Sequence, residues 1–97
     1  MTIEKVSIKN EQEAEALALV ILEFILADQV LRDRFLAMSG VTPSQMKSYL
    51  TDRNFLIGVL DFLLGNEVDV ISFCEQKEVP LENPKIAWEK LVGYSEG

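Results

Sequence analysis

The sequence has 97 residues and a net charge of −7, and 48% of its residues are hydrophobic. The hydrophobic content is typical of a globular domain and argues against a disordered chain, whereas the acidity disfavours binding to the phosphate backbone of a nucleic acid. One cysteine and no histidine exclude a disulfide framework, a thiolate zinc site and catalysis by histidine.

The polar start of the chain and the short apolar runs indicate where the protein resides. Residues 1–10 are mostly polar and lack the apolar segment of a signal peptide. The longest apolar run, residues 16–22, is much shorter than the roughly 20 residues that cross a bilayer. We predict a cytoplasmic protein of one domain, residues 1–97, with residues 93–97 as a tail. Residues 1–9 form a frayed lead-in, in which Ile3, Val6 and Ile8 pack loosely.

Three helices are expected in the first half of the chain. Asn10 precedes a helix over residues 11–27 that is apolar from residue 16 onward except at Glu23, which is typical of a helix in the middle of a fold. Asp28 starts a helix over residues 29–39, and Gly40 ends it in a left-handed conformation. A proline follows Thr42 and predicts a third helix that ends near residue 50. The expected inward residues of the second helix are Val30, Leu31, Phe35 and Met38, and those of the third are Met46, Tyr49 and Leu50.

Three further helices are expected in the second half. Asp52 precedes a helix over residues 53–64 that is apolar from Phe55 onward except at Asp61, with Gly58 permitting a close approach. The next two helices cover residues 67–77 and about 82–92. Since the connections are short and no segment alternates like a strand, we predict an all-α fold, a compact orthogonal bundle of six helices.

Residues 22–41 resemble residues 60–79, which lie thirty-eight positions later. The identical pairs are Leu22/Leu60, Phe24/Phe62, Leu26/Leu64, Val30/Val68, Phe35/Phe73 and Val41/Val79. Residues 10–50 and 51–92 are therefore interpreted as pseudo-repeated halves of three helices each. A true duplication and two unrelated helix pairs that follow the same packing rules both explain the pattern. Gly40 corresponds to Glu78, so we expect the second turn to be built differently.

Two acidic residues and the cysteine are the candidates for chemistry. Glu23 and Asp61 occupy equivalent repeat positions and could share a proton or bind a hard cation. We favour the interpretation that each marks the exposed edge of its helix, because a buried unpaired charge is costly. Cys74 corresponds to Leu36 and is expected in the core. We therefore predict no catalytic, cofactor-binding or metal-binding residue and no enzyme.

Residues 37–50 follow the pattern of a DNA-binding helix-turn-helix, with a glycine turn and a capped second helix. Residues 32–53 carry a net charge of +2, in contrast to the acidic remainder. The candidate binding residues within residues 32–53 are Arg32, Arg34, Lys47 and Arg53. They could contact DNA, or an acidic surface of a partner or a second copy. Trp88 is expected to close the core, and an exposed Trp88 would instead indicate a binding hot spot.

Several segments resemble a family of small alphaproteobacterial proteins known as domain of unknown function 3572. They are residues 17–19, 34–37, 39–43, 52–56 and 59–67, and the segment from Leu60 to Leu64 with Glu67 downstream is the most specific. The resemblance covers residues 13–93. It implies an all-helical fold and supplies no activity, cofactor or catalytic residue.

The sequence thus favours a non-enzymatic module for protein–protein interaction, which binds another protein or forms a homodimer. The first alternative is a DNA-binding regulator that uses residues 37–50. The second is an ion-binding protein or enzyme built on Glu23 and Asp61.

Overall fold

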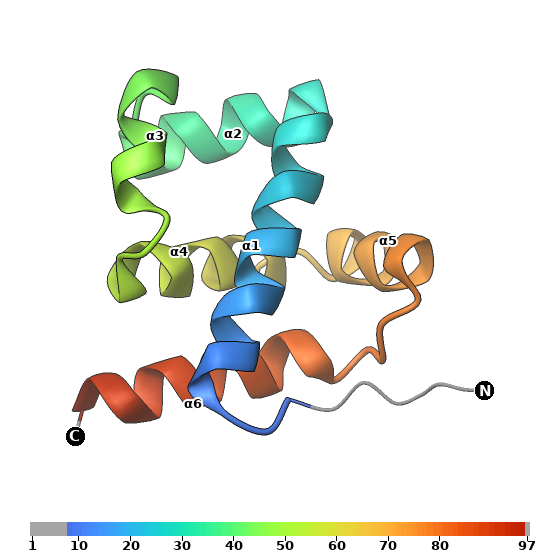
Figure 1. The fold of residues 1–97 in the computed structure, drawn as a ribbon. Helices are drawn as coiled ribbons and strands as arrows, with labels where there is room; N and C mark the ends of the chain where they lie inside the picture. The colour runs from blue at the N-terminus through green and yellow to red at the C-terminus, as the bar shows by residue number, and fades with distance from the viewer. Residues whose placement is uncertain (1–7, 97) are drawn as a thin grey trace.

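The computed structural model describes residues 8–96, with side chains up to residue 93, and these residues form six helices (Figure 1). The helices are α1 (Glu11–Ala27), α2 (Gln29–Ser39), α3 (Pro43–Tyr49), α4 (Arg53–Leu64), α5 (Glu67–Lys77) and α6 (Asn83–Glu96). The described residues contain no strand, and the predicted all-α bundle is confirmed. Within residues 8–96, no helix combines the length and the apolar content that crossing a membrane requires.

The helix starts are set by local caps, as predicted for the helices over residues 11–27, 29–39 and 53–64. The side chains of Asn10, Asp28, Asp52 and Asn66 each accept a backbone N–H from the first turn of the helix that follows. Such caps satisfy amide groups that have no partner within the helix. Because these signals lie within a few residues of each boundary, the short connections between helices are encoded locally.

The two ends differ from the expectation. Ile3 and Val6 lie outside the described residues, but Ile8 is buried and the backbone N–H of Lys9 donates to the Glu13 carboxylate at 2.7 Å. The lead-in is therefore anchored at residues 8 and 9 and is not frayed there. At the other end, α6 continues through Gly93 to residue 96, so the predicted tail is wrong for residues 93–96.

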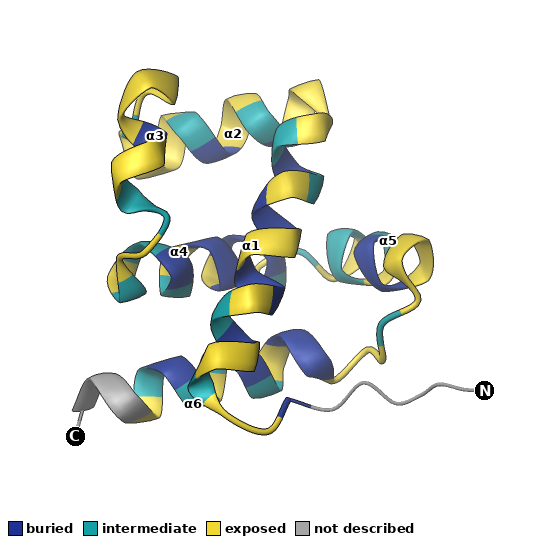
Figure 2. Ribbon diagram, viewed as in Figure 1, coloured by how far each residue is buried: buried dark blue, intermediate teal, exposed yellow. Residues whose placement is uncertain are grey.

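The core lies where α1, α4 and α6 meet. In Figure 1, α1 crosses both α4 and α6, while α2 and α3 lie at one end of the molecule. The buried residues in Figure 2 follow the faces of these three helices that look towards one another. The fully enclosed side chains on these three helices include Ile21, Ile25, Val59, Leu60 and Leu91. Burial of each such side chain contributes about 1.5–3 kcal/mol, so the three helices hold the rest of the fold.

Two aromatic pairs link the halves reciprocally. The rings of Phe24 and Phe73 have centroids 5.3 Å apart at 75°, and those of Phe62 and Phe35 have centroids 5.4 Å apart at 79°. Phe24 corresponds to Phe62, and Phe35 to Phe73. The phenylalanine in the first helix of each half therefore packs edge-on against the one in the second helix of the other half, an arrangement that stabilises aromatic pairs.

The turn after α5 corrects one expectation. Glu78 adopts a left-handed conformation with φ of 57°, close to the 72° of Gly40. The backbone N–H of Gly40 donates to the carbonyl oxygen of Leu36, and that of Glu78 donates to the equivalent carbonyl oxygen of Cys74. The two turns thus share their left-handed residue and its hydrogen bond.

They differ at the next residue. The backbone N–H of Val79 donates to the carbonyl oxygen of Cys74, whereas that of Val41 donates to the Ser39 hydroxyl. The prediction of a differently built second turn is therefore wrong for the left-handed residue but confirmed for the residue that follows it.

Helix α2 buries a narrower face than expected. Leu31 and Phe35 are buried, as predicted, but Val30 and Met38 are 65% and 74% exposed. The helix lies at the outside of the molecule and rests on its neighbours along one face (Figure 1). The prediction that Val30 and Met38 face inward is therefore wrong, because helical periodicity does not show how much of an apolar face is covered.

Candidate functional site

Arg53 does not contribute to an exposed basic surface. Its guanidinium forms an ion pair and hydrogen bond with Glu11, and its Nε atom lies 3.9 Å from the carboxylate of Glu15. The three side chains are about two-thirds buried and connect the start of α4 to the first turns of α1. The predicted residue thus serves a contact between two core helices.

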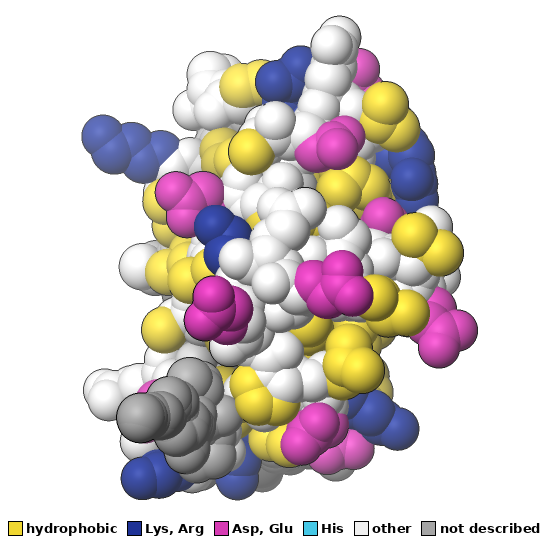
Figure 3. Space-filling view, turned by 90° about the vertical axis from the view of Figure 1, so that its right-hand side faces the viewer, with side chains coloured by type: hydrophobic (Ala, Val, Ile, Leu, Met, Phe, Trp, Pro, Cys, Tyr) yellow, Lys and Arg dark blue, Asp and Glu magenta, His cyan; other side chains and the backbone are white. Residues whose placement is uncertain are grey.

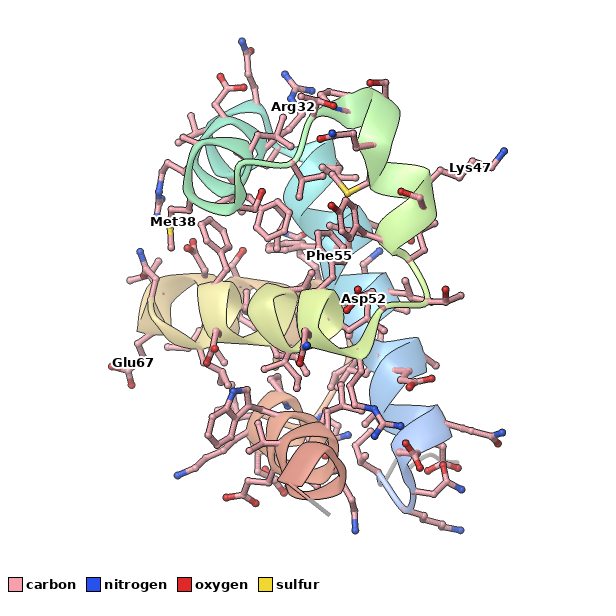
Figure 4. All side chains as sticks on the ribbon, turned by 90° about the vertical axis from the view of Figure 1, so that its left-hand side faces the viewer. Arg32, Met38, Lys47, Asp52, Phe55 and Glu67 are labelled. Carbon is pink, nitrogen blue, oxygen red and sulfur yellow. The ribbon has the colours of Figure 1, made fainter. Side chains whose placement is uncertain are left out.

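The other predicted basic residues are also dispersed. The Nε atom of Arg32 lies 3.7 Å from a carboxylate oxygen of Asp33, and the guanidinium of Arg34 lies 5.5 Å from the centre of the Phe62 ring. Lys47 is exposed on α3, and Figure 4 shows it on a different side of this end of the molecule from Arg32. The structure therefore does not bring the four residues together.

The uncharged polar side chains of α3 and of its cap form local hydrogen bonds. The Gln45 side chain accepts the backbone N–H of Thr42 at 3.1 Å, and the Ser48 hydroxyl donates to the carbonyl oxygen of Gln45 at 2.8 Å. The hydroxyls of Thr42 and Ser44 are 3.1 Å apart. In the helix-turn-helix interpretation these side chains would contact base edges. In this structure they form local hydrogen bonds instead, which disfavours that interpretation.

The candidates for chemistry are placed as the simpler interpretation predicts. Glu23 and Asp61 are both exposed, and Cys74 is buried in the core. The Cys74 thiol donates to the carbonyl oxygen of Pro80 at 3.7 Å. Burial, and to a smaller degree the charge of Glu82, raise the pKa of this thiol, which disfavours the reactive thiolate. In the part of the chain that the structure describes, no three His, Cys, Asp or Glu residues could hold a metal ion together.

Trp88 lies half-buried on α6, and its ring packs against the core. The indole Nε1 atom is enclosed and has no hydrogen-bond partner among residues 8–96. Since most of the ring is used by the fold, the structure agrees with a role in closing the core. An enclosed indole N–H is also not presented to a partner.

The most distinctive surface feature is a hollow of about 400 Å³ between α2 and α4, called the α2–α4 hollow below. Figure 4 shows Met38 at the edge of the space between these helices and Phe55 deeper inside. Most of the lining is apolar, and its polar side chains stand mainly on α4. The lining residues are Phe35, Met38, Ser39, Val41, Asn54, Phe55, Gly58, Asp61 and Phe62.

Aromatic rings form the rigid floor of the hollow. The Phe35 ring packs edge-on against Phe62 and, with centroids 5.8 Å apart, against Phe55. The Phe55 ring in turn lies 5.6 Å from the ring of Tyr49. Because each ring is held by its neighbours, the floor is preformed, which is the usual condition of a binding pocket.

The hollow depends on Gly58. A Cβ atom built at this position would meet no atom within 4 Å, so the missing side chain leaves space and not a tight contact. The equivalent residue of the first half is Val20, and the residue equivalent to Met38 is Gln76. The sequence hypothesis noted Gly58 but missed the hollow, although a glycine within an otherwise apolar helix was the signal that could have indicated it.

A second groove of about 400 Å³ runs between α2 and α5 and is more polar. Its walls include Asp28, Arg34, Asp69, Ser72 and Gln76. Figure 3 shows the face on the side of α5, where hydrophobic side chains lie in separate groups divided by acidic and uncharged ones. An apolar partner would have to cover these polar groups, which costs free energy unless they are paired. The α2–α4 hollow is therefore the better candidate site.

The chain was also compared with known proteins. No curated protein and no solved structure matches it. Residues 11–94, nearly the whole chain, match the sequence model of a family described as "Protein of unknown function (DUF3572)". This agrees with the resemblance found over residues 13–93, and the chain belongs to this family.

Proposed function

We propose that the domain is a non-enzymatic protein-docking module and that its docking surface is the α2–α4 hollow. The observation that carries the proposal is a preformed apolar space of about 400 Å³ with an aromatic floor, open to solvent beside the highly exposed Met38. A bulky apolar side chain entering this space would contribute about 1.5–3 kcal/mol through burial. Such an anchor in a desolvated pocket is the usual centre of a protein interface.

The alternatives have less support. For a DNA-binding regulator, several phosphate contacts are needed, but Arg53 is committed to Glu11 and Glu15 and the uncharged polar side chains of α3 bond locally. For an ion site or an enzyme, Glu23 and Asp61 are exposed and stand on different helices. We therefore place both alternatives below protein docking.

Filling the hollow tests the proposal. Gly58→Leu places a side chain in the hollow without a clash of its Cβ, and Gly93→Leu makes the same change at a helical glycine outside it, also without a clash. Leucine favours a helix over glycine, so both variants should fold. Tagged native protein and both variants would be incubated with a lysate of the source cells, and the proteins retained would be compared by mass spectrometry.

We expect native protein and Gly93→Leu to retain the same partner, and Gly58→Leu to lose at least nine-tenths of it. The partner can be a second copy of the chain. An untagged copy added to the mixture detects this case, because it is then retained by the tagged protein. If all three proteins retained the same set in the same amounts, docking through the hollow would be wrong.

A further inference from the structure

We infer that the occupant of the α2–α4 hollow is a second copy of this chain, with Met38 of each copy entering the hollow of the other. This inference rests on the proposed function, since it names the partner of the same surface. It starts from Met38, which is 74% exposed and stands on the rim of the hollow. A projecting apolar side chain and an apolar hollow thus occur side by side on one patch.

A twofold interface requires this combination. In a dimer with twofold symmetry, the same patch of both copies meets, so each patch has to carry both the projection and the space that receives it. The side chain of Met38 is flexible, and its sulfur makes favourable contacts with aromatic edges. The rings of Phe35, Phe55 and Phe62 line the space that it would enter.

Opposite charges stand on the two helices beside the hollow. Asp61 on α4 lines the hollow, and Arg34 on α2 lines the neighbouring second groove but lies over the ring of Phe62, which also lines the hollow. Within the described part of the chain neither of these side chains forms an ion pair. A twofold axis that lays α2 of one copy across α4 of the other brings Arg34 of each copy against Asp61 of its partner. Opposite charges paired in this way fix the register of an interface.

The pair of helices equivalent to α2 and α4, namely α5 and α1, provides an internal comparison. At the positions equivalent to Met38 and Gly58 this pair has Gln76 on α5 and Val20 on α1. It therefore has neither the exposed methionine nor the missing side chain. Two features that are both needed for self-association occur together on α2 and α4 and are both missing from the equivalent pair.

The size of the chain indicates a weak dimer. The chain exposes 5865 Å² in total, and specific interfaces cover about a tenth of a small protein. A contact of that size lies at the lower end of specific interfaces. The net charge of −7 repels the second copy, and salt screens this repulsion within about 10 Å. The exposed pairs of Arg34 with Asp61 contribute little beside this repulsion between the whole chains, so raising the salt concentration should strengthen the dimer, whereas it would weaken binding to a basic partner.

Sedimentation of the full chain tests the inference. Native protein, Gly93→Leu, Gly58→Leu and Met38→Asp would be measured from micromolar to millimolar concentration at low and moderate salt, with circular dichroism to verify the fold. We expect native protein and Gly93→Leu to approach twice the chain mass of 10.9 kDa. Gly58→Leu and Met38→Asp should weaken the association at least tenfold. A native chain that stays monomeric at millimolar concentration, or variants that associate as well as native protein, would overturn the inference.

A charge exchange tests the register. Arg34→Asp and Asp61→Arg should each weaken the dimer several-fold, and the double variant should regain most of the loss because the attraction is restored with its signs reversed. A double variant no better than the worse single variant would contradict the pairing of Arg34 with Asp61. The native chain could prove monomeric while Gly58→Leu still fails to retain a protein that the native chain captures from the lysate. In that case the second copy is wrong as the occupant, and docking through the hollow stands. If both experiments show no effect of Gly58→Leu, both proposals are wrong.

Discussion

The halves formed by α1–α3 and α4–α6 share their core positions but not their outer surfaces. Phe35 and Phe73 are both buried, whereas the third helices differ: α3 has 7 residues at one end of the molecule, and α6 has 14 and packs on both α1 and α4. The repeated phenylalanines therefore hold the halves together. The candidate site combines repeated residues, among them Phe35, with Met38 and Gly58, which do not repeat and which distinguish it from the equivalent surface.

The largest expected difference between the halves concerns the paired phenylalanines. Phe73 is completely enclosed, so Phe73→Ala should lower the free energy of unfolding by about 3–5 kcal/mol. Phe35 lines the α2–α4 hollow, into which neighbouring side chains can relax, so Phe35→Ala should cost less, towards about 3 kcal/mol. Urea unfolding measures both. Equal losses would mean that the hollow does not loosen the first half.

A second comparison concerns the two left-handed turns. Gly40→Ala should destabilise the protein by about 1–2 kcal/mol, because a Cβ atom disfavours this conformation. No atom lies within 4 Å of the position where that Cβ would be, so the cost is one of backbone conformation. Glu78→Gly should relieve a similar strain at the equivalent position and stabilise the protein by up to about 1 kcal/mol.

Thermal unfolding of both turn variants gives the answer. The matched control is Gly93→Ala, which is helical with no positive φ and should be neutral or stabilising. A loss of stability in Glu78→Gly would show that the Glu78 side chain makes a contribution that outweighs its backbone strain.

The helix caps provide a smaller and more symmetrical test. Asp28 and Asn66 occupy equivalent positions and each accepts one backbone N–H at 3.1 Å, from Leu31 and Val68 respectively. Asp28→Ala and Asn66→Ala should each lower the free energy of unfolding by about 1 kcal/mol, and the two losses should add in the double variant. Losses that differ by more than twofold would show that one junction depends on tertiary contacts rather than on its cap.

The same caps explain why the helices could be predicted from the sequence. A cap and the residues it satisfies lie within one turn, so the boundaries before Gln29, Arg53 and Glu67 are encoded locally. The turn at Glu78 could not be predicted in this way. Glutamate does not favour the left-handed region. The carbonyl oxygen of Cys74 accepts the N–H of Glu78 and also that of Val79, the latter at 3.0 Å, and these two bonds outweigh the conformational cost.

The candidate site was harder to predict from the sequence, because it depends on the separation of two helices. Helical periodicity marked Met38 as apolar but could not show that the neighbouring helix leaves it uncovered, 74% exposed. Closeness in sequence suggested that Arg53 joins a basic patch, whereas the fold pairs it with Glu11, 42 positions earlier. Local patterns therefore identified the elements and their caps, and long-range packing determined the surface.

The smallest expected effect concerns the contact between equivalent positions of the two halves. With the same offset of thirty-eight residues, Arg53 corresponds to Glu15, and the two side chains lie 3.9 Å apart. Charges of opposite sign thus stand where a symmetrical molecule would bring identical residues together.

The side chains of Arg53, Glu11 and Glu15 are each about one-third exposed. Arg53→Met should therefore lower the free energy of unfolding by less than about 1 kcal/mol, and the loss should be smaller at high salt. Arg53→Glu should cost more, since it faces two carboxylates, and adding Glu11→Arg and Glu15→Arg should recover that loss. Urea unfolding at low and high salt measures these differences, and a loss that does not decrease with salt would show that Arg53 acts through packing of its aliphatic stem.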